Sequence, residues 1–189
     1  MTSKNKKNVC IVGCGHIGLP LALHISLKSS GVNIFDKDKK KLKNIQNNKI
    51  NFFEKDLLDF LELENKRKKL NYFFDYKDIK SNFYIICIGS MLEKTKKVSN
   101  KVLLHSLKNI SKILKSGDLL IIRGTVQVGF TSNLAKKIIE KNSKLKVGSN
   151  IFLGFMPERL IEGDSLNELN KLPQIISGVT NNCVSQIKK

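Results

Sequence analysis

Apolar residues gather in short runs along this chain, and amphipathic stretches separate the runs. The first run, at 9–12, is apolar throughout, and mostly apolar runs follow at 32–35, 83–88, 119–122 and 151–155. Strands that are covered on both faces of a parallel sheet read as continuous runs of this kind. Their alternation with helices predicts an α/β fold with a doubly wound parallel sheet.

The stretches between the runs repeat apolar residues at helical spacing. We expect helices at 17–25, 37–49, 57–69, 102–114, 131–139 and 166–172, with short strands at 73–74 and 174–177. Thr131 is expected to cap the helix that follows it. The last residues, 179–189, read as a polar tail.

The turn after the first strand carries the sharpest chemical signal. It reads Gly13-x-Gly15-x-x-Gly18, and a helix follows at once. Gly13 lets the chain turn sharply, Gly15 lets the backbone approach a pyrophosphate, and Gly18 lets the helix pack on the strand. Unpaired N–H groups and the helix dipole favour negative charge at the start of that helix. We predict a dinucleotide site along this turn, with His16 and Ile17 among its contacts.

The sequence signature of a dinucleotide site has a second part, an acidic residue at the end of the next strand. Here that residue is Asp36. Its distance from Gly13 is close to the ~20 residues expected of the acid that binds the adenosine ribose. An Asp there repels a 2′-phosphate, so we expect NAD rather than NADP. A helix cap or turn residue is the alternative interpretation of Asp36 when it is considered alone.

Two further residues are candidate cofactor contacts. Lys41 is a candidate for binding the adenosine phosphate or ribose, and a solvated lysine is the alternative. Ser90, at a strand end, is a candidate cofactor contact or an ordinary turn serine.

Charge and length add little to this picture. The chain has 189 residues, which suits one domain, and a formal net charge of +18. Of its 34 basic residues only Arg67, Arg123 and Arg159 are arginines, and lysines are spread over most of the chain. We interpret this as compositional bias and expect no nucleic acid partner, although the charge favours association with an anionic nucleotide.

Cysteine usage and hydropathy indicate the cellular compartment in which the protein is expected. The four cysteines form no CxxC pair, so we expect free thiols and no metal. No apolar run approaches the ~20 residues that cross a membrane. Residues 1–7 lack the apolar segment of a signal peptide. These features together predict a cytoplasmic protein without a membrane partner.

Five segments, in order, resemble the UDP-glucose/GDP-mannose dehydrogenase family over nearly the whole chain. They are 13–22 (Gly-Cys-Gly-His-Ile-Gly-Leu-Pro-Leu-Ala), 35–38 (Phe-Asp-Lys-Asp), 124–126 (Gly-Thr-Val), 157–159 (Pro-Glu-Arg) and 172–178 (Leu-Pro-Gln-Ile-Ile-Ser-Gly). Members that oxidise UDP-N-acetylhexosamines look most similar. The resemblance implies NAD-dependent oxidation of C6 of a nucleotide sugar to the acid, through an aldehyde and a thiohemiacetal on a cysteine. It also implies that Asp36 binds the ribose, that Lys41 lies beside it and that Ser90 contacts the cofactor.

The same resemblance implies catalytic roles for three residues. Thr125 would hold the catalytic water, and Glu158 and Glu162 match acidic residues of the family's active site, with Glu162 the better candidate for general base. From the residues alone, two carboxylates four apart share one face if the segment is helical, and the pKa of one can then be raised by the other. Two surface glutamates, with Glu162 as a cap, are the alternative, and without the resemblance they are the better interpretation.

Several positions depart from the family pattern. Gly124 stands where the family usually has Ser, Gly89-Ser90-Met91 where it has Pro-Thr-Pro, and Gln127-Val128 where Pro-Pro is common. Nothing matches the family's long helix bearing Lys and Asn, or its second domain with the nucleophilic cysteine. Cys183 has polar neighbours and no adjacent His. We therefore expect an NAD-binding domain at 1–178 and the start of the connecting helix at 179–189.

Such a chain is expected to bind NAD, to oxidise no sugar alone, and to form a homodimer only with the missing central helix. One alternative is a non-catalytic nucleotide-binding or assembly module. Another is a Rossmann dehydrogenase related to 6-phosphogluconate dehydrogenase, against which the Pro157-Glu158-Arg159 segment argues.

Overall fold

The computed structural model describes residues 8–92 and 98–189. Residues 1–7, on which the expectation about a signal peptide depends, lie outside the described residues. The chain divides into two compact units, the first formed by Met1–Tyr84 and Leu160–Lys171 and the second by Ile85–Arg159 and Leu172–Lys189. The boundary falls within β4 (Phe83–Ile86).

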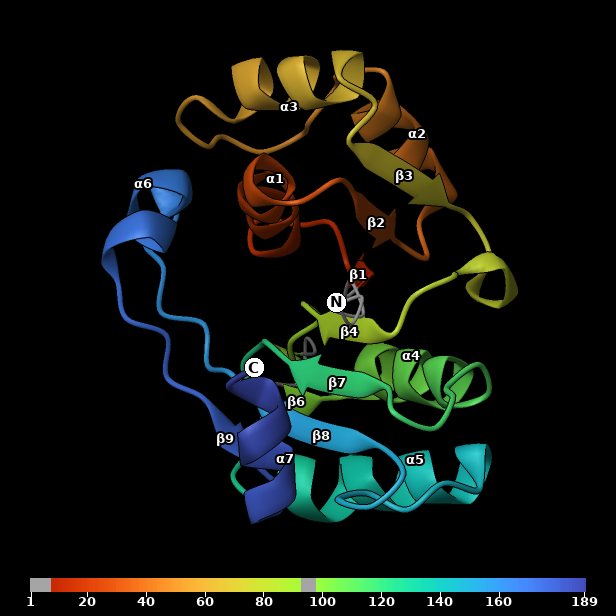
Figure 1. The fold of residues 1–189 in the computed structure, drawn as a ribbon. Coiled ribbons are helices and arrows are strands. Elements are labelled where there is room, and N and C mark those ends of the chain that lie inside the picture. The colour runs from red at the N-terminus through yellow and green to blue at the C-terminus, as the bar shows by residue number, and fades with distance from the viewer. Residues whose placement is uncertain (1–7, 93–97) are drawn as a thin grey trace, which may run out of the picture. The chain divides into compact units, whose positions relative to one another are not determined.

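The first unit is a parallel sheet with helices, built around the first strand of the sequence. Its strands β1 (Val9–Val12), β2 (Val32–Phe35) and β3 (Leu70–Phe73) lie in the order β3-β2-β1, and Ile11 is opposite Ile34. The helical elements are α1 (Gly18–Lys28), α2 (Lys39–Gln46), α3 (Leu57–Lys66), η1 (Tyr76–Asp78) and α6 (Ser165–Lys171). Although it comes late in the chain, α6 packs against α1 (Figure 1).

The second unit repeats the strand–helix alternation. The strand order is β4-β7-β8-β9, with β7 (Leu119–Ile122) parallel to β8 (Phe152–Phe155) and β9 (Ser177–Gly178) antiparallel to β8. The other elements are the hairpin β5 (Met91–Leu92) and β6 (Val98–Ser99), and α4 (Lys101–Ser111), η2 (Phe130–Ala135), α5 (Lys136–Ser143) and α7 (Asn181–Ile187). The α/β class expected from the sequence is confirmed.

The structure corrects or refines three local points. Thr131 caps nothing, because the helical segment begins at Phe130 after Gly129, whose φ is 81°. The residues between Glu158 and Glu162 are not helical, so these carboxylates do not share a helix face. Residues 179–189, expected to be polar and to begin a connecting helix, contain α7, and its Cys183 is fully buried. Among the described residues, no helix has the length and apolar character needed to span a bilayer.

Candidate functional site

The glycine-rich turn has the open backbone that a pyrophosphate requires. Gly13 has a φ of 98°, and its N–H donates to the Phe35 carbonyl at 2.8 Å, which fixes the turn to the end of β2. A Cβ added at Gly15 would meet no atom within 4 Å, so the space above this residue is open. Helix α1 begins directly after Ile17 with no side-chain cap and no acidic residue in its first turn. Its first N–H groups are therefore suited to an anion.

Asp36 lies next to that turn and is 5% exposed. Its Oδ2 accepts the Cys14 N–H at 2.9 Å and its Oδ1 accepts the Asp38 N–H at 2.9 Å. Lys41 Nζ is 2.5 Å from Oδ2, beside Asp36 as expected. Because a carboxylate offers about four acceptor positions, capacity remains for a ribose hydroxyl. Asp38, by contrast, caps α2, and the N–H of Lys41 holds the pKa of its carboxyl below the usual range.

The residues of this part of the first unit fit a dinucleotide. The turn offers an open backbone, and Asp36 is fixed beside it with an acceptor position to spare. A hollow of about 260 Å³ adjoins Lys41, and three lysines contribute to it against the single acid Asp38. Its lining residues are Asp38, Lys40, Lys41, Asn44, Ile45, Lys49, Ile50, Asn51 and Phe52. This positive charge favours a phosphate-bearing ligand.

Glu162 lies in the first unit and contacts the same turn. Its Oε1 is 3.0 Å from Nδ1 of His16, and both side chains are largely exposed, at 73% and 48%. The His16 ring also contacts the ring of Phe52, with centroids 4.3 Å apart. The structure thus joins two residues that the sequence singled out for separate roles, one for the cofactor and one for catalysis.

The second unit brings Ser90 and Thr125 together. The Ser90 N–H donates to the Thr125 carbonyl at 2.9 Å, and the Ser90 hydroxyl donates to Asn100 Oδ1 at 2.5 Å. Thr125 is exposed at the end of β7. The two glycines that depart from the family pattern touch each other here: a Cβ at Gly124 would lie 3.1 Å from Gly89 Cα.

Glu158, also in the second unit, is part of a buried ion pair that the sequence analysis missed. Its Oε2 accepts from Nε of Arg123 at 2.7 Å, and the two side chains are 8% and 1% exposed. Its Oε1 accepts the Arg159 N–H at 2.8 Å, and Arg123 Nη1 donates to Gln174 Oε1 at 2.8 Å. An arginine directly after an apolar strand was the available signal, because a buried guanidinium requires an anionic partner.

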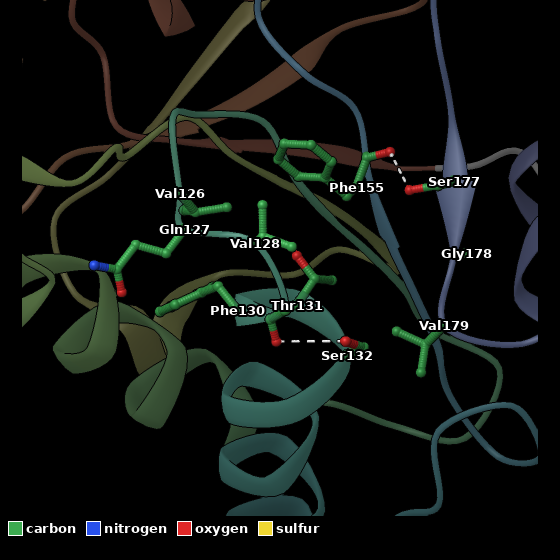
Figure 2. A pocket seen from close by; sticks show the side chains of 11 residues that line it. Val126, Gln127, Val128, Phe130, Thr131, Ser132, Phe155, Ser177, Gly178 and Val179 are labelled. Atoms are coloured by element: carbon green, nitrogen blue, oxygen red, sulfur yellow. Dashed lines mark hydrogen bonds between the residues drawn. The ribbon is translucent and has the colours of Figure 1, made fainter.

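A second hollow, with a volume of about 330 Å³, is lined in part by the residues that come directly after Thr125 in the sequence (Figure 2). Its lining is mainly apolar, and Figure 2 shows Phe155 and Ser177 on one side, joined by a hydrogen bond of 3.4 Å. The lining residues are Val126, Gln127, Val128, Gly129, Phe130, Thr131, Ser132, Phe155, Ser177, Gly178 and Val179. These residues come from segments far apart in the chain, so their spacing gave no indication of the hollow.

None of the four cysteines is in a disulfide. Burial raises the pKa of Cys87 to about 12, and Arg123 only partly offsets this effect. Cys183 is buried and accepts the Leu153 N–H at 3.4 Å. Because the thiolate is the nucleophile of cysteine chemistry, burial argues against such a role for Cys87.

With this geometry established, comparison with known proteins gives the family. The model of the UDP-glucose/GDP-mannose dehydrogenase family, NAD binding domain, matches residues 7–189. The chain belongs to this family. The expected cofactor, NAD, is confirmed by that match. Membership also decides against a closer relation to 6-phosphogluconate dehydrogenase.

Individual relatives agree with this membership. The chain is 28% identical over 173 residues to the UDP-N-acetyl-D-glucosamine 6-dehydrogenase of Pseudomonas aeruginosa, covering 91% of this chain and 40% of the relative. It is 31% identical over 182 residues to the UDP-N-acetyl-D-mannosamine dehydrogenase of Methanococcus aeolicus, covering 94% and 40%. The chain therefore spans about two fifths of the length of these relatives.

Solved structures show the same fold. A UDP-N-acetyl-mannosamine dehydrogenase from Staphylococcus aureus superposes with a TM-score of 0.86 at 26% identity, over 96% of this chain and 44% of that one. A GDP-mannose dehydrogenase from Pseudomonas aeruginosa superposes with a TM-score of 0.88 at 21% identity, over 96% and 43%. At 21% identity this second match shows the fold alone.

Proposed function

We propose that this chain is the cofactor-binding part of an NAD-dependent nucleotide-sugar 6-dehydrogenase whose substrate is a UDP-N-acetylhexosamine. The observation that carries the proposal is the bond from the Cys14 N–H to Asp36, which holds a buried carboxylate against the glycine-rich turn. The substrate class is supported by the names of the two relatives above, both dehydrogenases of UDP-N-acetylated sugars.

In this proposal each group of residues has one task. The turn at Gly13–Gly18 binds the pyrophosphate through backbone N–H groups, and Asp36 accepts a ribose hydroxyl while Lys41 keeps its carboxylate in place. NAD supplies the hydride acceptor when bound. Thr125, exposed at the end of β7, holds a water through its hydroxyl.

Glu162 is the carboxylate that we assign to proton removal during catalysis. It is exposed, whereas Glu158 has both oxygens engaged by Arg123 and Arg159. We assign Glu158 the task of fixing the chain after β8. A domain at 1–178 followed by a connecting segment at 179–189, and the family's cysteine outside this chain, complete the proposal.

Calorimetric titration of the chain with NAD and NADP tests the cofactor part. We expect saturable NAD binding and at least about tenfold weaker NADP binding, because Asp36 accepts from the 2′-hydroxyl and repels a phosphate. Asp36→Asn should weaken NAD binding about tenfold and reduce the preference. Asp75→Asn is the matched control, since Asp75 also accepts a backbone N–H, from Lys77, in the same unit. Equal affinity for both cofactors would overturn the assignment.

The substrate part is tested with protein expressed from the source DNA, including whatever reading frame follows the Lys189 codon. NADH formation at 340 nm is measured with UDP-N-acetylglucosamine, UDP-N-acetylmannosamine, UDP-glucose and GDP-mannose. We expect turnover of an N-acetylated UDP-sugar by a product that continues into a cysteine-bearing domain, and no turnover by the 189-residue chain alone. Turnover by that chain would contradict the proposal.

A further inference from the structure

The turn that carries Glu162 is held by a carboxylate from a distant part of the first unit. Glu54 is 5% exposed, and its Oε2 accepts the Gly163 N–H at 3.1 Å. Its Oε1 accepts the N–H of Ser165, the first residue of α6. The Lys55 N–H donates in return to the Gly163 carbonyl at 3.1 Å. Three hydrogen bonds therefore join the 54–55 segment to the 163–165 segment.

These bonds fix the backbone that directly follows Glu162. Gly163, the next residue, has a φ of 97°, so the chain reverses here in a conformation that suits glycine. The Phe52 ring, two residues before Glu54, contacts the His16 ring. The 52–55 segment thus touches the glycine-rich turn through Phe52 and the Glu162 turn through Glu54.

The contact between Glu162 and His16 is too exposed to hold this turn by itself. Exposed ion pairs contribute little, because solvent screens them and ordering two side chains costs entropy. A buried carboxylate that accepts two backbone N–H groups makes charge-assisted bonds, which are stronger. The backbone at 163–165 is therefore fixed from Glu54, and the position of the Glu162 carboxylate follows from it.

We propose that Glu54 is a positioning residue, whose buried carboxylate holds the 161–165 turn so that the Glu162 carboxylate lies against His16 of the glycine-rich turn. Through this arrangement the residue assigned to proton removal is placed in direct contact with the cofactor-binding turn. The inference rests on the proposed function for the chemical role of Glu162, but its structural content is independent of any ligand.

The test uses Glu54→Gln in the isotope-labelled 189-residue chain, studied by NMR. The amide side chain can accept at only one atom, so one backbone N–H loses its partner. We expect hydrogen exchange at Gly163 and Ser165 to become at least about tenfold faster. We also expect loss of the nuclear Overhauser contact between the His16 ring and the Glu162 side chain, which a merely stabilising role of Glu54 would leave intact.

Asp118→Asn is the matched control. Asp118 is also buried, at 4% exposure, and accepts a backbone N–H, from Lys115 at 2.8 Å, in the second unit. The same carboxylate-to-amide change there should leave exchange at Gly163 and the His16–Glu162 contact unaltered. Retention of that contact in Glu54→Gln, or unchanged exchange at both amides, would overturn the proposal.

If Glu54→Gln fails to fold, a second variant tests the positioning role of Glu54. Ser165→Pro removes the N–H donor at the first position of α6, where proline is tolerated. It should likewise abolish the His16–Glu162 contact, and its persistence would refute the positioning role. NAD titration of the unaltered chain is run alongside. Absence of NAD binding there would count against the proposed function and leave the outcome of the NMR test standing.

Discussion

Arg123 and Glu158 show how a buried charge shapes this part of the molecule. A guanidinium with 1% exposure is stable only when its charge is neutralised and its donors are bonded, and Glu158 and Gln174 provide this. The pair joins the ends of β7 and β8 within the second unit. Any proton transfer by Glu158 would have to break it, which is why we assign that task to Glu162.

Arg123→Met tests this pair. Glu158 would keep its buried position without a cation, so we expect the free energy of unfolding at pH 7, from urea denaturation, to fall by about 3–5 kcal/mol. The double variant Arg123→Met with Glu158→Gln removes the stranded charge and should recover part of the loss. A double variant as unstable as the sum of both single variants would show that the two residues act independently.

At the scale of elements, the loops after β4 and β7 fit each other through two glycines. A Cβ at Gly124 would lie 3.0 Å from the Ile88 carbonyl oxygen and 3.1 Å from Gly89 N, so a larger residue would require this backbone to shift by a few tenths of an ångström. The bond from the Ser90 N–H to the Thr125 carbonyl completes the contact. Two positions that separately depart from the family pattern are thus one structural feature.

Gly124→Ser introduces the residue that the family usually has, and we expect it to destabilise this chain. The neighbouring atoms belong to the backbone and cannot rotate away, so overpacking should cost about 1–3 kcal/mol in urea denaturation. Gly15→Ala is the control, because a Cβ there meets nothing within 4 Å and should leave the stability unchanged. Full stability of Gly124→Ser would mean that the two loops can separate at little cost.

For the whole molecule, the net charge of +18 is the dominant property. Its lysines are dispersed, but three of them line the hollow beside Lys41. An anionic cofactor should therefore bind more tightly at low ionic strength, where the Debye length is long.

NAD affinity measured by calorimetry at 50 and 500 mM NaCl checks this expectation. We expect a loss of roughly three- to tenfold at the higher salt, since screening weakens attraction between exposed charges. Adenosine, which carries no phosphate, is the control and should show little change. Salt-independent NAD binding would mean that the lysines play no part in cofactor binding.

The sequence by itself determined the parts of this protein that depend on local spacing. The apolar runs predicted the strands, and β1, β2 and β7 have the predicted bounds. Three glycines and Asp36 predicted the dinucleotide turn, because turn geometry and strand length are encoded within a few residues. The resemblance in five short segments predicted the family, which the comparison confirmed.

Only the tertiary structure decided which side chains meet. Arg123 and Glu158 are 35 positions apart, and Glu54 and Ser165 are 111 apart. Such pairs form where strand ends and returning segments converge, and no periodicity in the chain records that convergence. The burial of Cys183 has the same origin, since α7 packs against β8 and β9. Local patterns thus specified the elements, and packing specified the partners of the charged residues.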